Sequence, residues 1–153
     1  KNDYPCLPPV EHISQFIARH IKNGAIRLTG VNGHGKLYTY HDPCYLGRHN
    51  DVYEAPRQAL DAISGLKRVE MQRCRDRSFC CGGGGLMLFY EPEEDQRMGV
   101  LRVQMAAQAG ADVIVTACPF CLVNIEDAIK VAGMEGKMAA IDLTELIAQH
   151  MIE

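Results

Sequence analysis

The chain lacks a long uninterrupted run of apolar residues, and it lacks a strong excess of charge of either sign. Sixteen Lys and Arg residues against nineteen Asp and Glu residues give a net charge of −3 and a pI near 6.1. Overall electrostatics therefore give no reason to expect a nucleic acid as a partner. No segment has the roughly 20 apolar residues that a transmembrane helix needs, and no signal peptide is recognisable. We expect no transmembrane segment in this chain.

Phosphate-binding patterns are also missing. The four glycines at residues 82–85 are not followed by Gly-Lys-Ser/Thr, and they do not complete G-x-G-x-x-G. No linker or low-complexity tract divides the 153 residues, of which 47% are apolar, so we expect one compact domain. Because the first residue is Lys1 rather than Met, we expect a piece of a longer polypeptide, and a membrane anchor in its missing part is left open.

Hydrophobic periodicity predicts an α/β fold. A helix is expected over residues 10–22, with an apolar face made by Ile13, Phe16, Ile17 and Ile21. A hairpin of residues 26–29 and 37–40 is expected to follow it. Strands are then predicted at 37–41, 68–71, 112–116 and 138–141, and helices at 55–64, 93–109, 121–132 and 142–152. In the helix at 93–109 the predicted apolar stripe is Met98, Leu101, Met105 and Ala109.

This alternation predicts a small parallel sheet with helices on both faces, in Rossmann-like layers. We expect residues 1–35 to form an N-terminal helix and connecting hairpin segment, and residues 36–153 to form a cysteine-rich domain. The two are expected to make one compact domain together.

The seven cysteines are an odd number in a chain of ordinary hydrophobicity, which argues against a secreted disulfide framework and favours a reducing cytosolic compartment. Five of them form a pattern: the single Cys44, the adjacent pair Cys80 and Cys81, and a C-x-x-C at Cys118 and Cys121. A disulfide between adjacent residues is strained, whereas two neighbouring thiolates can face one multinuclear centre. The pattern therefore favours a metal or an iron–sulfur cluster. Cys6 and Cys74 are interpreted as bystanders.

Each of these five cysteines follows a predicted strand. In a parallel sheet, the loops after the strands' carboxyl ends meet at one edge, so all five sulfur atoms are expected there. The C-x-x-C lies between a strand and a helix, where the helix N-terminus favours thiolate over thiol. Alone it fits a redox disulfide, half of a zinc site or a pair of cluster ligands.

Neighbouring residues extend the candidate site. Glycines 82–85 allow the backbone to approach a bulky inorganic core and direct N–H groups at its sulfurs. His41 and His49 flank Cys44 and could bind zinc, but neither is assigned as a ligand. Arginines crowd the site as well, and they can offset the charge of an anionic cluster, receive an anionic substrate, or form a solvated loop. These are Arg48, Arg73, Arg75 and Arg77.

The whole pattern, Cys44, then Cys80-Cys81-Gly82, then Cys118-x-x-Cys121, resembles the CCG cysteine-rich domain over residues 36–150. That domain occurs in the B subunit of heterodisulfide reductase and in related iron–sulfur oxidoreductases. The wording HDPCYLGRH at residues 41–49 looks most like the heterodisulfide-reductase-like and flavoprotein-linked members.

The resemblance implies a non-cubane [4Fe–4S] cluster ligated by all five cysteines. It also implies a second repeat of a longer protein, paired with an upstream CCG repeat of the same polypeptide. The other implied partners are subunits of an electron-transfer complex, either a flavoprotein or a ferredoxin-like iron–sulfur subunit. The isolated repeat is expected to bind its metal without turning a substrate over, and it is expected in the cytoplasm, with membrane association through the missing chain or partner subunits as the alternative.

Three functions compete at this point. In the first, an iron–sulfur domain passes electrons to a disulfide, a quinone pathway or a partner subunit. In the second, a structural zinc site supports a binding or assembly module of a multi-subunit oxidoreductase, although five cysteines exceed the four ligands that zinc takes. In the third, a thiol–disulfide enzyme uses only Cys118 and Cys121.

Overall fold

A four-stranded sheet forms the centre of the computed structural model, which describes residues 10–31, 35–90 and 92–152. The strands stand in the order β2-β1-β3-β4, and every neighbouring pair is parallel. Their bounds are Leu37–Tyr40 for β1, Lys67–Val69 for β2, Val113–Thr116 for β3 and Ala139–Asp142 for β4. The predicted parallel α/β sheet is therefore confirmed.

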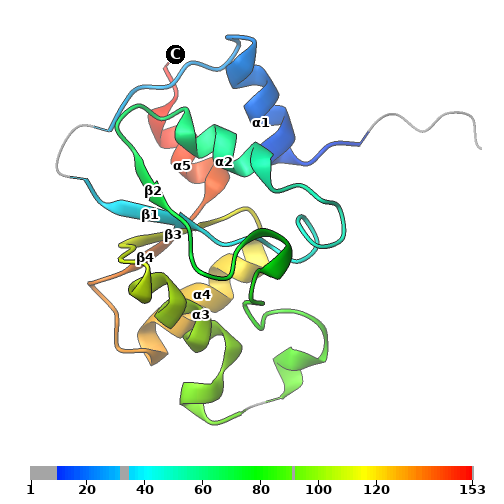
Figure 1. Ribbon diagram of the computed structural model, residues 1–153, viewed down its shortest axis with the longest axis vertical. Helices are drawn as coiled ribbons and strands as arrows, with labels where there is room; N and C mark the ends of the chain where they lie inside the picture. Colours follow the sequence, from blue (N-terminus) through cyan, green and yellow to red (C-terminus); the bar gives the residue numbers. More distant parts are fainter. Residues whose placement is uncertain (1–9, 32–34, 91, 153) are drawn as a thin grey trace, which may run out of the picture.

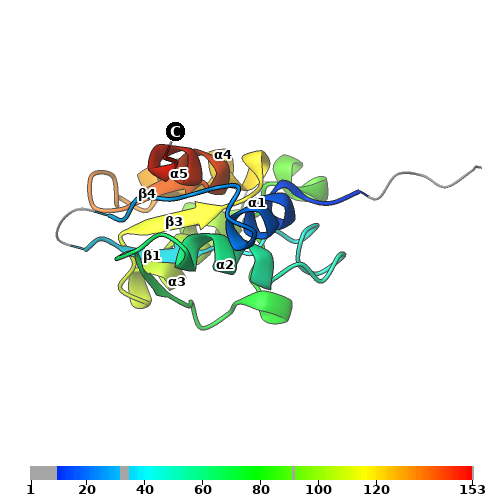
Figure 2. The ribbon, with the colours of Figure 1, turned by 90° about the horizontal axis from the view of Figure 1, so that it is seen from above.

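Helices cover both faces of this sheet (Figure 1). The first face carries α1 (Ile13–Lys22), α2 (Glu54–Asp61) and α5 (Leu143–His150), and Figure 2 views the molecule from this side. The second face carries α3 (Met98–Gln108) and α4 (Pro119–Val131).

The side chains of β3 point alternately to the two faces of the sheet, and each face has its own apolar cluster. Val113 and Val115 pack in the apolar cluster with α1, α2 and α5, whereas Ile114 packs in the cluster with α3 and α4. All four residues of β3 are buried, as expected for a strand covered on both faces. The strand next to the Cys118–Cys121 segment is thus fixed from both sides of the sheet.

The predicted hairpin between residues 26–29 and 37–40 is wrong. Both edges of β1 are already occupied, since Thr39 is in register with Val69 of β2 and with Ile114 of β3. Leu28 instead forms an isolated antiparallel bridge with Met151, supported by a 2.7 Å hydrogen bond from the Thr29 N–H to the His150 carbonyl. The segment after α1 therefore pairs with the end of α5. Residues 32–34 of the expected turn lie outside the described residues.

Two apolar stripes also differ from the prediction. In α1, Ile17 is buried and Ile21 packs against the core, but Ile13 and Phe16 are exposed. Of the stripe predicted for α3, Met105 and Ala109 pack partly buried against the core. The fully buried residues of this helix are instead Gly99, Val100, Arg102, Val103 and Ala106. That helix begins at Met98 because Glu94–Gln96 form a separate 3-10 turn. Among the described residues, no helix combines the length and hydrophobicity needed to cross a membrane.

Candidate metal centre

Three chain segments that follow strands bring the cysteines together. Cys44 lies in the turn after β1, the Cys80–Cys81 pair follows β2 through a loop with a short 3-10 helix, and Cys118 follows β3. Cys118 is the N-cap of α4, which places Cys121 in the first turn of that helix. The helix begins two residues earlier than predicted because Pro119 occupies its first position, where a missing N–H costs nothing.

The centre of the site is a contact between two buried sulfurs from different segments. The Sγ atoms of Cys81 and Cys121 are 3.3 Å apart, and each residue is 4% exposed. Cys80 adjoins Cys81 in the chain, and Cys118 is the N-cap of the helix whose first turn holds Cys121. We call the four thiols of the pair and of the C-x-x-C the sulfur network.

Cys44 lies beside this network at its accessible rim. With Cys118 and Cys121 it lines a hollow of about 640 Å³, and with Cys80 it lines a smaller one. Exposed apolar side chains, Tyr45 and Phe120, lie next to these cysteines in sequence. Cys74, in contrast, does not line this hollow, and Cys6 lies outside the described residues.

The pKa values of the four thiols are shifted in opposite directions. Hydrogen bonds from Cys121 and Cys80 lower the pKa of Cys81 far below its usual value, against the effect of burial, and His41 and the Gly83 N–H contribute to the same shift. A hydrogen bond from Cys121, with support from the backbone N–H groups of Cys121 and Phe120, lowers the pKa of Cys118 to about 6. The pKa values of Cys80 and Cys121 are raised, because these thiols donate to neighbouring sulfur atoms. The surroundings thus favour the thiolate form at Cys81 and Cys118 over that at Cys80 and Cys121.

The glycines after the pair direct backbone donors at the sulfurs. The Gly82 N–H donates to Cys80 Sγ and the Gly83 N–H donates to Cys81 Sγ, each at 3.3 Å. Gly82 has φ +82°, and a Cβ there would lie 3.1 Å from Met98 Cβ. At Gly83 an added Cβ would lie 3.2 Å from the Phe120 carbonyl oxygen. Two consecutive glycines are therefore required by backbone conformation and by close packing on α3 and α4.

Replacing Gly82 by alanine should lower the free energy of unfolding by about 1–3 kcal/mol, because a side chain would be held in the left-handed region and pressed against Met98. Gly84→Ala is the matched control, since Gly84 has φ −124° and open space around its Cα. The control should change stability by less than about 0.5 kcal/mol. Urea denaturation of the metal-free variants measures both, and equal effects would contradict this account of the glycine segment.

A buried ion pair fixes the loops that hold Cys44 and the Cys80–Cys81 pair. Arg57 of α2 binds Asp42 with both ends of its guanidinium, at 2.7 and 2.9 Å, and its Nε donates to Glu70 at 2.7 Å. Asp42 also accepts the Arg75 backbone N–H at 2.8 Å, and its carbonyl accepts the Ser78 hydroxyl at 3.2 Å. The end of β1 is thereby tied to the loop that precedes Cys80.

The arginine-rich loop is engaged with protein groups. Arg75 pairs with Glu54 and Glu70, and the Arg73 guanidinium lies 4.7 Å from the centre of the Phe79 ring. Arg48 donates to the Ser78 carbonyl at 2.7 Å. The fold therefore uses these three side chains to hold the loop before the cysteine pair.

Sequence reasoning missed Arg102 and left His41 unassigned. Arg102 is 0% exposed on α3, and its Nε donates to His41 Nδ1 at 3.0 Å. His41 is itself 1% exposed, and one of its ring nitrogens lies within 4.8 Å of the Cys81 and Cys121 sulfurs. Burial lowers the pKa of His41, and burial lowers the pKa of Arg102 to about 10. The available signal was the sequence His41-Asp42-Pro43-Cys44 at a strand end; Arg102 had no signal, because it interrupts an apolar helix face.

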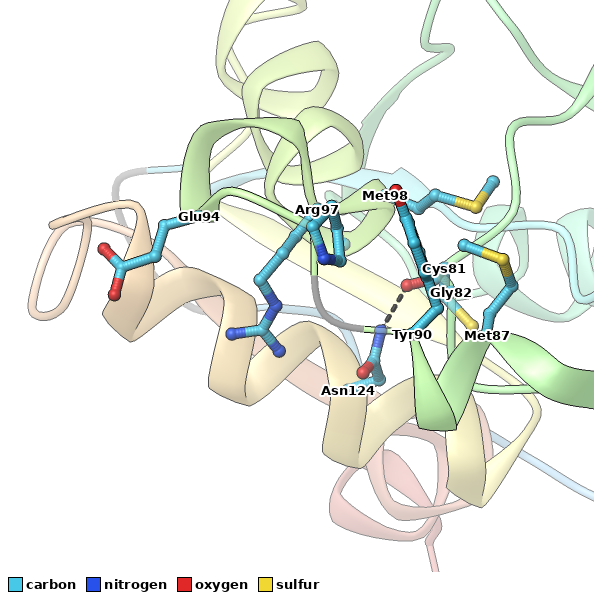
Figure 3. A pocket seen from close by; sticks show the side chains of 10 residues that line it. Cys81, Gly82, Met87, Tyr90, Glu94, Arg97, Met98 and Asn124 are labelled. Atoms are coloured by element: carbon cyan, nitrogen blue, oxygen red, sulfur yellow. Dashed lines mark hydrogen bonds between the residues drawn. The ribbon is translucent and has the colours of Figure 1, made fainter.

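A second hollow, of about 330 Å³, lies on the α3–α4 side of Cys81 (Figure 3). Asn124 of α4 points into it and donates its side-chain amide to the Cys81 carbonyl. Met87, Tyr90 and Met98 form part of its wall. The Asn124 hydrogen bond anchors the backbone of the Cys80–Cys81 pair on α4. The same helix carries Cys121, so both parts of the sulfur network are fixed to α4.

These features define an α/β domain with a cysteine-rich site at the carboxyl edge of a parallel sheet. Its sequence matches the family described as CCG, cysteine-rich domain, over residues 38–126. The chain therefore belongs to the CCG cysteine-rich domain family.

Several curated proteins are similar to this chain. The probable iron-sulfur-binding oxidoreductase FadF of Bacillus subtilis is 37% identical over 99% of the chain and 22% of its own length. The D subunit of the dihydromethanophenazine:CoB–CoM heterodisulfide reductase of Methanosarcina barkeri is 39% identical over 93% of the chain and 34% of its own length. The EtfAB:quinone oxidoreductase of Syntrophomonas wolfei is 34% identical over 99% of the chain and 22% of its own length. The chain thus spans about a third or less of the length of these relatives.

Proposed function

We propose that this chain is the iron–sulfur electron-transfer domain of a heterodisulfide-reductase-like oxidoreductase. Cys44, Cys80, Cys81, Cys118 and Cys121 hold a non-cubane [4Fe–4S] cluster in this proposal. The observation that carries it is the 3.3 Å contact between the buried sulfurs of Cys81 and Cys121, which brings the Cys80–Cys81 pair to the C-x-x-C, with Cys44 at the rim. The names of the similar proteins, which include an iron–sulfur-binding oxidoreductase and a component of a heterodisulfide reductase, support the same class.

The residues around the sulfurs suit an anionic group. Arg102 is fully buried, and its Nη2 has no hydrogen-bond partner within the described part of the chain. The nearby carboxylates of Asp42 and Glu70 are already bound by Arg57. A buried guanidinium without a paired anion is costly, and a thiolate-ligated cluster carries the negative charge that would balance it.

Within this proposal the protein's own groups bind the cluster and set its charge environment. An iron–sulfur cluster supplies one-electron chemistry when it is bound. The five thiolates hold it at the sheet edge, and the Gly82 and Gly83 N–H groups donate to two of the ligating sulfurs. Such donors stabilise negative charge on sulfur and raise the reduction potential. The rim at Cys44, Tyr45 and Phe120 is the side from which electrons or a disulfide would approach.

Zinc is the second candidate, and the grouping of His41 with Cys81 and Cys121 within 4.8 Å is the observation on its side. Zinc in structural sites takes four tetrahedral ligands and has no redox role. The five cysteines of the sequence pattern exceed that number, so the iron–sulfur proposal accounts for more of the pattern. A thiol–disulfide enzyme accounts for only Cys118 and Cys121.

The relatives' length suggests the setting of this domain. We propose that residues 36–153 form the iron–sulfur unit, that residues 1–35 lead into it from an upstream CCG repeat, and that the active site needs both repeats. The electrons would then pass to a disulfide, a quinone pathway or another subunit, either a flavoprotein or a ferredoxin-like protein. We propose a cytoplasmic location, with membrane attachment through the rest of the polypeptide or its partners.

Electron paramagnetic resonance after anaerobic reconstitution with iron and sulfide tests the function. We expect a brown protein with a paramagnetic signal in one oxidation state that disappears and returns through repeated reduction and oxidation. A colourless protein with stoichiometric zinc, prepared under the same anaerobic conditions, would overturn the proposal. Retained thiol–disulfide exchange activity in a Cys44→Ala, Cys81→Ala double variant would favour the enzyme that uses only the C-x-x-C.

A further inference from the structure

Arg102 holds His41 through a hydrogen bond that has only one chemically allowed direction. An arginine guanidinium can donate hydrogen bonds but cannot accept them. The 3.0 Å contact between Arg102 Nε and His41 Nδ1 therefore makes Nδ1 the acceptor. In a neutral imidazole the single proton then resides on Nε2.

The remaining nitrogen of His41 is the one available to the sulfur network. One ring nitrogen of His41 lies within 4.8 Å of the Cys81 and Cys121 sulfurs, and all three residues are buried. Because Nδ1 is occupied by Arg102, the proton on Nε2 is the one that can be donated to Cys81 Sγ. This assignment places a neutral imidazole donor beside one of the two most buried sulfurs of the site.

Arg102 is itself fixed, so it can impose this arrangement. Its Nη1 donates to the Arg73 carbonyl at 2.7 Å, and the residue is completely buried between α3 and the strand ends. Rotation of the guanidinium away from His41 would leave a second buried donor unpaired, in addition to Nη2. The hydrogen bond to the Arg73 carbonyl and the cost of an unpaired buried donor thus both hold Arg102 against His41.

The same contact prevents His41 from acting as a metal ligand. A histidine that binds a metal through Nε2 must carry its proton on Nδ1. That proton would face the Nε–H of Arg102 at a separation of 3.0 Å between the nitrogens, and two donors would oppose each other. His41 can therefore complete a Cys and His zinc site only if Arg102 is displaced.

We propose that Arg102 locks His41 as a hydrogen-bond donor to Cys81, so that the pair tunes the bound cluster and excludes a zinc site that would include His41. Both are positioning residues, acting through the Cys81 sulfur. The tuning part of this inference rests on the proposed iron–sulfur function. The tautomer and the exclusion of His41 from metal binding do not, since they concern the protein without a cluster.

Nitrogen-15 NMR of the imidazole rings in the metal-free wild-type protein tests the tautomer directly. We expect the His41 proton on Nε2, whereas His49, which is exposed beside Tyr45, serves as the internal reference for an unconstrained ring. A His41 proton on Nδ1 would overturn the proposal. Because this measurement uses the wild-type chain, it decides the question even if a variant fails to fold.

Cobalt(II) absorption tests the exclusion of His41 from metal binding. Wild-type protein titrated with Co²⁺ should show sulfur-only coordination, and the spectrum should be the same for His41→Gln. Arg102→Met should gain nitrogen coordination, which a His41→Gln, Arg102→Met double variant should lose. Nitrogen coordination by His41 in the wild-type protein would contradict the lock.

The reduction potential of the reconstituted domain tests the tuning. Loss of the donor in His41→Leu, and loss of the buried cation in Arg102→Met, should each shift the one-electron reduction equilibrium at least about tenfold toward the oxidised state, which is about 59 mV. His41→Gln keeps an N–H near the Nε2 position and should restore most of the shift. His49→Gln and Arg19→Gln are matched controls on an exposed histidine and on an exposed arginine of α1 that lines neither hollow beside the cysteines, and they should leave the potential unchanged.

Failure of the proposed function and failure of the tuning would give different results. A wild-type protein that binds no iron overturns the proposed function, while the NMR and cobalt results still decide the lock. A wild-type protein with a cluster whose potential is the same in His41→Leu, Arg102→Met and the two controls overturns the tuning and leaves the proposed function intact.

Discussion

Replacing Arg57 by methionine is expected to lower the free energy of unfolding of the metal-free domain by about 3–5 kcal/mol. The change removes both hydrogen bonds from Arg57 and leaves the Asp42 carboxylate, whose side chain is only 2% exposed, buried without its cation and with only the Arg75 N–H as a hydrogen-bond donor among the described residues. Removal of one member of a buried pair is costly because the remaining charge is not solvated. Urea denaturation followed by circular dichroism measures the loss.

The control for this experiment is an ion pair at the surface. Arg97 pairs with Asp127, and the two side chains are 34% and 54% exposed. Arg97→Met should therefore cost about 1 kcal/mol or less. If Arg57→Met lowered the free energy of unfolding no more than Arg97→Met does, the Arg57–Asp42 ion pair would not be what fixes the loops around the cysteines.

Replacing Cys81 by serine is expected to reduce the iron bound after anaerobic reconstitution from about four atoms per chain to about one or fewer. Cys81 is buried, its sulfur lies 3.3 Å from the Cys121 sulfur, and it accepts the Gly83 N–H. A serine hydroxyl is a far harder and less acidic ligand than a thiolate. Iron and acid-labile sulfide analysis measures the effect.

Cys74→Ser is the matched control, because Cys74 is a free, partly exposed cysteine that does not line the hollow beside the sulfur network. It should bind iron and sulfide as the wild-type domain does. Equal iron content in Cys81→Ser and Cys74→Ser would show that the buried Cys81 sulfur is not a ligand.

The order of the elements is readable from the sequence because it depends on local patterns. The run at residues 112–116 is apolar and β-branched, and β3 is buried on both faces. Asp142 stands at the expected start of the last helix, and its carboxylate accepts the Thr144 N–H at 2.7 Å. Placement of the cysteines after strand ends then follows from parallel topology alone.

The errors arise where a long-range contact outweighs a local pattern. Two short extended segments close in sequence predict a hairpin, but β1 is paired on both edges by β2 and β3, which lie far along the chain. The residues after α1 pair with residues near position 151 instead. Nothing in the sequence of a short strand indicates which other strands will pair with its two edges.

Arg102 shows the same limit within the candidate site. A charged residue on an apolar helix is ordinarily interpreted as solvent-facing, so the sequence pattern assigns the apolar stripe of α3 to Met98, Leu101 and Met105. The helix is instead rotated to bury Arg102 against His41 and the Arg73 carbonyl. Only the tertiary structure reveals that these two partners stand at the right place to accept its hydrogen bonds.

Native mass spectrometry of the anaerobically reconstituted wild-type domain tests the central claim most directly. The account predicts one dominant species, heavier than the metal-free chain by about four irons and four sulfides. A dominant species with a single zinc ion, or with no added mass, would contradict the claim that these cysteines converge on one polynuclear iron–sulfur core.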